Sequence, residues 1–281
     1  MRLLIFALTF LFAIGAQAAF GSLAQAADEP RVVRIPGPSG SELEVAIYGE
    51  DGKRHPLLLF NHGSPVDSSD RKTLVARYGT PARWFAKRGF IVAVPTRRGY
   101  GHSTGNWAED FGRCDRPDFV NAANATAADF RATIDYMASQ PNVDASKVVL
   151  VSHSAGGWGS ISGDAARLPG IVAIVNFAGG RGGDPKRGFA CNETELVRAA
   201  AVFGATNHVP SLWFYAENDL FFRPELATKM YDAYVKAGGQ VTFIKAPVSG
   251  KDGHRYYNAA SPDQSWGPAV TAFLSKILPI K

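Results

Sequence analysis

The sequence lacks the short motifs that would assign a metal, a nucleotide or a nucleic acid directly. It has no His-Glu-x-x-His segment, no cysteines and histidines grouped at metal-ligand spacing, and no P-loop. The glycine-rich segment NFAGGRGG (176–183) lacks the strand-turn-helix context and the downstream acid of a dinucleotide site. Lysines and arginines are scattered among acidic residues. We therefore expect no metal, no cofactor and no nucleic-acid partner.

The chain also lacks internal repeats, low-complexity tracts and any long linker rich in proline, glycine or serine. Of its 281 residues, 46% are hydrophobic and 20% are charged, as in folded globular proteins. We expect residues 27–281 to form a single domain, with insertions near 100–120 and 180–207.

The first 26 residues, MRLLIFALTFLFAIGAQAAFGSLAQA, carry one charge, then a long apolar stretch, then small residues. This order is typical of a secretory signal peptide. We expect cleavage after Ala26, with Ala18 as the alternative. Cleavage after Ala26 removes Arg2 and lowers the net charge from +5 to +4. A retained anchor is the other interpretation, but the apolar segment is short for a membrane span and is interrupted by Gly15 and Gln17. The sequence predicts a secreted or periplasmic protein without stable membrane insertion.

Alternating patterns predict the fold class. Strands are expected at 31–35, 42–49, 55–63, 90–99, 147–154, 171–180, 211–219 and 241–247, and helices at 74–88, 122–139, 157–167, 225–237 and 266–277. Most of the later strands are continuous apolar runs, which indicates burial on both faces. We expect an α/β fold whose eight-stranded, doubly wound sheet is largely parallel, begins antiparallel and carries helices on both faces. Functional residues of such sheets collect at the carboxyl ends of the strands.

The segment VSHSAGGWG (151–159) stands where one predicted strand ends and a helix begins. A sharp turn at this place forces its central residue, Ser154, into strained geometry and requires small neighbours such as Ser152 and Gly156. Ser154 is therefore a candidate nucleophile. The alternative is that Ser154 only caps the helix while the glycines allow close packing.

A serine nucleophile needs a histidine base that a carboxylate orients. In this fold the acid and the histidine follow in that chain order, each after a later strand. Asp219 ends the strand at 211–219, and His254 follows the strand at 241–247. Glu217 is the alternative acid, and Asp252 is expected to make a local salt bridge.

The segment FNHGSP (60–65) follows the third predicted strand and is typical of an oxyanion loop. We expect the Ser64 and Ala155 amides to stabilise an oxyanion, and His62 to contact substrate. A plain turn is the alternative. Three other histidines are expected to be structural or loop residues: His102, His153 and His208.

Together these segments resemble α/β-hydrolases of the dienelactone hydrolase-like and prolyl oligopeptidase-like group. The matching segments are HGSP (62–65), PTRRGYGHSTG (95–105), SHSAGG (152–157), AEND (216–219) and DGH (252–254). The resemblance covers almost all of the mature chain and implies the fold and a Ser-His-Asp triad, but it names no substrate. Dienelactone hydrolases use cysteine as nucleophile, whereas this chain has Ser154. Prolyl oligopeptidases carry a propeller domain, for which the chain has no room.

We therefore predict an exported serine hydrolase that cleaves small carboxylic esters through an acyl-enzyme. A serine peptidase or amidase is the alternative, and a non-catalytic binding protein of the same fold is a further one. Testing ester and peptide substrates would separate the first two.

The two cysteines lie in the expected insertions, Cys114 after the strand at 90–99 and Cys191 after the strand at 171–180. Both insertions belong to the edge of the sheet where lids grow. Because an exported protein meets an oxidising compartment, we expect a Cys114–Cys191 disulfide that pins two rim segments over the pocket. Two free thiols would be expected in a cytosolic enzyme.

Seven cations belong to loops expected to border the site: Arg97, Arg98, Arg113, Arg116, Arg181, Lys186 and Arg187. A positive rim would steer anionic esters inward, with Arg98 or Arg181 contacting the substrate. The alternative is that most of these cations form ion pairs with acids of the same segments: Glu109, Asp110, Asp115, Asp118 and Asp184.

Overall fold

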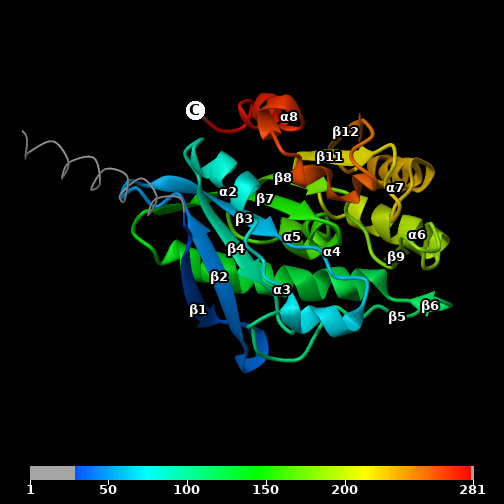
Figure 1. Cartoon of the computed structure of the whole chain (residues 1–281), viewed down its shortest axis with the longest axis horizontal. Helices are drawn as coiled ribbons and strands as arrows, with labels where there is room; N and C mark the ends of the chain where they lie inside the picture. The colour runs from blue at the N-terminus through cyan, green and yellow to red at the C-terminus, as the bar shows by residue number, and fades with distance from the viewer. Residues whose placement is uncertain (1–28, 280–281) are drawn as a thin grey trace, which may run out of the picture.

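The computed structural model describes residues 29–279 of the chain, and Figure 1 shows their arrangement. The main sheet has eight strands in the order β1-β2-β4-β3-β7-β8-β11-β12. Their bounds are β1 Arg31–Pro36, β2 Glu42–Tyr48, β3 His55–Asn61, β4 Ile91–Thr96, β7 Val143–His153, β8 Ile171–Phe177, β11 Ser211–Ala216 and β12 Val241–Ala246. β2 is antiparallel to β1 and β4, and the other neighbours are parallel. The predicted fold class is confirmed.

The central strands are buried on both faces, which explains their continuous apolar runs. Because side chains alternate along a strand, Leu57 and Leu59 of β3 enter one core while Leu58 and Phe60 enter the other. All four are 0% exposed. A strand with one polar face could not occupy this position, so the both-face pattern identified the sheet centre.

Helices cover the two faces unequally. The larger core packs residues of the sheet against α3 Phe119–Ala138, α4 Ala155–Ser160, α5 Gly163–Ala166, α6 Glu193–Gly204 and α7 Pro224–Lys236. The opposite core packs α2 Gly79–Ala86 and α8 Gly267–Leu274. In Figure 1 the long α3 runs beneath the sheet, and α8 lies above it. Residues 29–279 also contain four short 3-10 helices: η1 Pro38–Gly40, η2 Ser68–Thr73, η3 Gly253–Asn258 and η4 Pro262–Gln264.

The segments expected as insertions carry two small hairpins. β5 Gly112–Arg113 pairs with β6 Arg116–Pro117, and β9 Gly183–Asp184 pairs with β10 Phe189–Ala190. Helix α6 follows the second hairpin and is a helix that the sequence patterns did not predict. The sequence-based division into domains stays a prediction.

The predicted signal peptide, residues 1–26, lies outside the described residues. Within residues 29–279, no helix is both long enough and apolar enough to cross a membrane. The loops after β3, β7, β11 and β12 leave the carboxyl ends of parallel strands, so the topology gathers them at one edge of the sheet.

Candidate active site

Ser154 occupies a strained turn between β7 and α4. Its φ of 53° and ψ of −120° fall in a region that non-glycine residues rarely adopt. The neighbouring glycines are required by close packing, because a Cβ on Gly156 would lie 2.6 Å from the His62 carbonyl oxygen. A Cβ on Gly157 would lie 2.3 Å from Asn176 Oδ1. These contacts agree with the geometry predicted for this segment.

Ser152 stands where the usual Gly-x-Ser-x-Gly turn has its first glycine, and the structure shows how its hydroxyl is accommodated. Ser152 is completely buried, but its hydroxyl lies 2.5 Å from Ser160 Oγ. It also accepts a hydrogen bond of 3.1 Å from Asn61 Nδ2. Because the hydroxyl has partners on α4 and β3, the departure from the motif leaves no unsatisfied buried group at Ser152.

Asp219 and His254, distant in sequence, lie side by side. His254 Nδ1 is 3.1 Å from Asp219 Oδ2, and the side chains of both residues are buried. Asp219 Oδ1 also accepts hydrogen bonds from the amides of Phe221 at 2.8 Å and Phe222 at 2.9 Å. The Phe221 ring stacks on the His254 ring, with centroids 4.0 Å apart. The carboxylate is therefore fixed and positioned to orient the imidazole.

The two alternative acids occupy other positions. Glu217 is exposed. The Asp252 carboxylate instead accepts hydrogen bonds from the amides of Leu220 at 3.1 Å and His254 at 3.0 Å. Asp252 thus joins the loop of His254 to the loop of Asp219, and within residues 29–279 it makes no ion pair or hydrogen bond with the imidazole.

His153 connects the serine turn to the His254 loop. Its Nε2 donates a hydrogen bond of 2.9 Å to the His254 carbonyl oxygen. Burial, with a contribution from His254, holds the pKa of His153 well below its usual value, so the ring is neutral. Within residues 29–279, Ser154 Oγ has no hydrogen-bond partner. Hydrogen bonds between a nucleophile and its base are often long without substrate and tighten when it binds.

Two backbone amides beside Ser154 are free to donate. In the described part of the chain, neither the Ser64 nor the Ala155 amide donates a hydrogen bond. The loop passes close to Ser154, because a Cβ on Gly63 would lie 3.0 Å from Ser154 Cβ. Unpaired amides at this place are suited to binding an oxyanion.

The His62 ring forms hydrogen bonds that hold this loop in place. The Arg97 amide donates to His62 Nε2 at 3.0 Å, so the proton resides on Nδ1, which lies 2.6 Å from the Gly63 carbonyl oxygen. Burial and then the charge of Arg97 lower the pKa of His62 to about 3. Both ring nitrogens are used within the protein, and the predicted substrate contact of His62 stays a prediction.

Ser154 opens into a pocket of about 620 Å³. Ser64, Ala155 and Arg181 also line it, so four of the eight predicted catalytic, oxyanion and substrate-contact residues share one cavity. The other lining residues come from segment 65–71, the two insertions and the loop after Asp219: Pro65, Val66, Arg71, Trp107, Asp110, Phe111, Cys114, Gly180, Gly182, Gly183, Asp184, Arg187, Phe189, Cys191, Asn192, Phe221 and Phe222. A second pocket of about 400 Å³ shares only Ser64 and Pro65 with the first.

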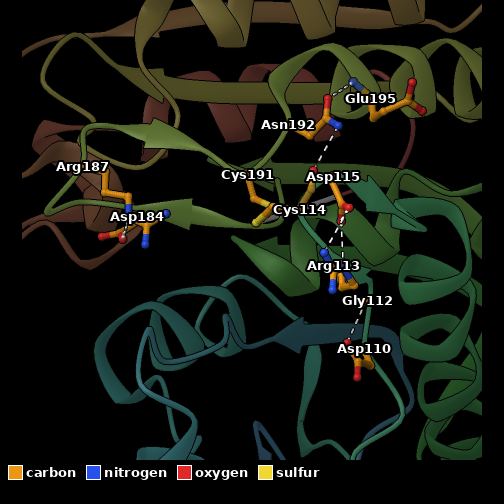
Figure 2. The surroundings of a disulfide bond; sticks show 10 residues. All are labelled: Asp110, Gly112, Arg113, Cys114, Asp115, Asp184, Arg187, Cys191, Asn192 and Glu195. Carbon is orange, nitrogen blue, oxygen red and sulfur yellow. Dashed lines mark hydrogen bonds and ion pairs between the residues drawn. A yellow bond between two sulfur atoms is a disulfide. The ribbon is translucent and has the colours of Figure 1, made fainter.

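Figure 2 shows the disulfide between Cys114 and Cys191. Both cysteines also line the pocket. The disulfide joins the β5–β6 hairpin to the segment between β10 and α6. Asn192 Nδ2 donates a hydrogen bond of 3.1 Å to the Cys114 carbonyl oxygen, and Asn192 Oδ1 accepts one of 3.2 Å from the Glu195 amide. The predicted disulfide is confirmed, and it fastens the two rim segments together.

Most of the arginines in these loops are ion-paired, which favours the second interpretation of the loop cations. The pairs are Arg97–Glu109, Arg98–Asp129, Arg113–Asp115, Arg181–Glu109 and Arg187–Asp184. Arg98 is not part of the pocket lining, and its substrate contact stays a prediction.

Sequence patterns missed Arg71 and Trp107, which lie together on the pocket wall. The guanidinium carbon of Arg71 is 3.6 Å from the centroid of the Trp107 ring. Within residues 29–279, Arg71 has no carboxylate partner. No motif predicted this contact, because it joins η2 to the loop before β5.

The sequence matches the model of the alpha/beta hydrolase family over residues 57–274, and the chain belongs to this family. No curated protein sequence matches it. Among solved structures, an esterase of Pyrococcus furiosus is 13% identical with a TM-score of 0.63, covering 91% of this chain and 93% of that chain.

Two further structures show how widely the fold is shared. An acylaminoacyl peptidase in complex with Z-Gly-Gly-Phe-chloromethyl ketone is 16% identical, with a TM-score of 0.61, covering 89% of this chain and 41% of that chain. A provisionally named dienelactone hydrolase of Klebsiella pneumoniae is 15% identical, with a TM-score of 0.57, covering 88% and 98%. At these identities the likenesses show the fold alone.

Proposed function

We propose that the protein is an exported serine hydrolase that cleaves small carboxylic esters. The observation that carries this proposal is the placement of Ser154. It stands in a strained turn, beside two free amides and on the wall of a pocket, while a buried carboxylate orients His254 at the same edge of the sheet. Family membership and the esterase fold likeness agree with this activity.

In the proposed reaction, His254 Nε2 removes the Ser154 proton while Asp219 holds the proton on Nδ1. Ser154 Oγ bonds to the carbonyl carbon of the ester, and the Ser64 and Ala155 amides stabilise the negative oxygen. His254 then donates its proton to the departing alkoxide, which leaves an acyl-enzyme and an alcohol. Water, deprotonated by His254, attacks the acyl carbon, and collapse releases the acid and restores the Ser154 hydroxyl.

The pocket supports a small-molecule substrate. Its volume of about 620 Å³ falls in the range of small-ligand sites, and its wall mixes aromatic side chains with a few charged groups. Arg181 is our proposed substrate contact, because it lines this pocket and also lies 3.3 Å from Ser64 Oγ.

Export is supported by two independent features. The sequence of residues 1–26 has the order of a signal peptide, and the Cys114–Cys191 disulfide is of the kind that persists in oxidising compartments. We propose that the mature enzyme begins after Ala26. N-terminal sequencing of the protein recovered from the periplasm or culture medium tests this assignment, and recovery only from the cytosol with residues 1–26 intact would contradict it.

The activity is tested with matched substrates that share one acyl group and differ in the leaving group. An ester, an amide and a peptide would be compared by kcat/KM in the parent protein and in Ser154→Ala. We expect turnover of the ester, with the amide and peptide much slower. A higher kcat/KM for the peptide would favour a peptidase, and no turnover of any acyl substrate would favour a binding protein.

A further inference from the structure

A single buried carboxylate lies behind the loop that carries Ser64. Glu109 is 1% exposed, and it forms ion pairs with Arg97 and Arg181, which are 0% and 4% exposed. Its Oε2 also accepts a hydrogen bond of 2.9 Å from the Tyr100 hydroxyl. Burial alone would raise the pKa of Glu109, but the charges of Arg97 and Arg181 outweigh it and hold the pKa far below its usual value. Glu109 is therefore ionised at neutral pH.

All three partners of Glu109 also contact the loop 62–64. Arg97 Nη1 donates a hydrogen bond of 2.5 Å to the His62 carbonyl oxygen. The Tyr100 hydroxyl lies 2.5 Å from Ser64 Oγ, and since it donates to Glu109, it accepts from Ser64. Arg181 Nη1 lies within hydrogen-bond distance of the same Ser64 oxygen, at 3.3 Å. The Glu109 carboxylate thus fixes three side chains that form hydrogen bonds with the two ends of the loop, His62 and Ser64.

The same loop is bound to the nucleophile turn. The His62 carbonyl oxygen that accepts from Arg97 also accepts a hydrogen bond of 3.1 Å from the Gly156 amide. The two free amides, of Ser64 and Ala155, therefore belong to segments that one backbone hydrogen bond joins. An oxyanion site is effective only when its donors are held in place before the reaction, because no energy is then spent on reorganisation.

We propose that Glu109 is the positioning residue of the oxyanion site, holding the Ser64 amide beside Ser154 through Arg97, Tyr100 and Arg181. This inference rests on the proposed function and adds to it a residue that touches neither substrate nor nucleophile. Sequence reasoning placed Glu109 only among acids that could neutralise loop cations, since its partners lie in two segments far apart in the sequence, 97–100 and the loop after β8.

An electrostatic role of the same cluster predicts the opposite sign. Two guanidinium groups and one carboxylate leave one net positive charge behind Ser64. If this charge alone stabilised the oxyanion, neutralising Glu109 would raise the local positive charge and increase kcat. If Glu109 positions the loop, neutralising it frees Arg97 and Arg181 to move, and kcat falls. The direction of the change therefore distinguishes the two roles.

The test compares Glu109→Gln and Tyr100→Phe with a matched control, Asp129→Asn. Asp129 is also 1% exposed and pairs with an arginine, Arg98, but it makes no hydrogen bond to the loop 62–64 in the described chain. For a neutral ester, we expect kcat of Glu109→Gln to fall about 10–100-fold with KM within about threefold, as expected for a displaced oxyanion donor. Tyr100→Phe should lose about tenfold, and Asp129→Asn should keep kcat within about threefold.

A boronic acid inhibitor supplies a readout that a purely structural defect would not move. It forms a tetrahedral adduct with an active serine, so its Ki should weaken in parallel with kcat in Glu109→Gln while the control stays unchanged. An unchanged or higher kcat in folded Glu109→Gln overturns the proposal. If that variant does not fold, Tyr100→Phe decides, and kcat within about threefold of the parent overturns it equally. Failure of a fluorophosphonate to label Ser154 in the parent would instead contradict the proposed function.

Discussion

Removal of the disulfide should destabilise the protein and loosen one wall of the pocket. The bond joins residues separated by 77 positions. A crosslink that closes a loop of this length lowers the entropy of the unfolded chain by an amount worth about 4.5 kcal/mol at 25 °C. Residual structure in unfolded chains usually reduces the measured effect, and we expect a loss of about 2–4 kcal/mol in the free energy of unfolding for Cys114→Ser/Cys191→Ser.

The kinetic consequence is expected in KM rather than kcat. The disulfide borders the pocket through the rim segments that contain Phe111 and Phe189, whereas Ser154, Asp219 and His254 lie on other loops. Freeing the rim therefore weakens substrate binding while the reacting groups keep their places. We expect KM to rise several-fold, by roughly 1 kcal/mol of lost binding energy, with kcat within about twofold.

Urea unfolding and steady-state kinetics measure these two effects on the same samples. For a protein of this size a loss of about 3 kcal/mol lowers the urea midpoint by about 1 M. The parent treated with reductant serves as a control and should match the double variant, and thiol titration of the denatured, unreduced parent should find no free thiol. A midpoint within about 0.2 M of the parent, with unchanged KM, would refute a stabilising role of the bond.

Three other substitutions probe different parts of the site. Asp219→Asn should lower kcat by about 10⁴-fold. Glu217→Gln changes an exposed side chain and should leave kcat unchanged. Equal losses in the two variants would show that the acid is misassigned. At low salt the parent should prefer a carboxylate-bearing ester over its neutral analogue by roughly tenfold in kcat/KM, because the Arg71 guanidinium lines the pocket without a carboxylate partner among the described residues. Arg71→Met should remove this preference. No preference in the parent would show that Arg71 is structural. Gly156→Ala should reduce the free energy of unfolding by about 1–3 kcal/mol and slow turnover, because the added Cβ would lie 2.6 Å from the His62 carbonyl oxygen. A variant that unfolds at the same temperature as the parent would contradict this packing.

The strands were predictable because their burial leaves a direct pattern in the sequence. Leu57 to Phe60 are consecutive apolar residues, as expected of a strand covered on both faces, and they alternate between the two cores. The boundaries were less accurate at β7, which begins at Val143 rather than near 147. Its pairing with β3 is irregular between Pro56 and Leu57, and such an irregularity has no signal in hydrophobic periodicity.

Helix α6 was missed although its start carries a recognisable signal. Asn192 caps the helix by accepting a hydrogen bond from the amide of Glu195, three residues later. Asparagine followed at this spacing by glutamate resembles a capping box, but it stands in a segment expected to form a rim loop. Attention to the cap rather than to hydrophobic periodicity would have found the helix.

The positions of the three proposed triad residues were predictable, because a motif fixes each of them to a strand end. Ser154, Asp219 and His254 follow β7, β11 and β12, and parallel topology gathers these ends. The cluster of Glu109 was not predictable, because its partners come from loops whose pairing depends on the folded chain. Sequence could count the charges of these loops but could not assign each cation to its acid.

Reaction of the parent with a fluorophosphonate, followed by mass spectrometry of its peptides, tests the nucleophile most directly. A single adduct on Ser154 is expected, formed at a rate that falls at least about 10³-fold in His254→Ala, because the serine hydroxyl reacts only when the histidine accepts its proton. Folded Ser154→Ala should take up no label and hydrolyse no ester. Labelling of a different residue, or ester hydrolysis retained by folded Ser154→Ala, would contradict the assignment of Ser154 as the nucleophile.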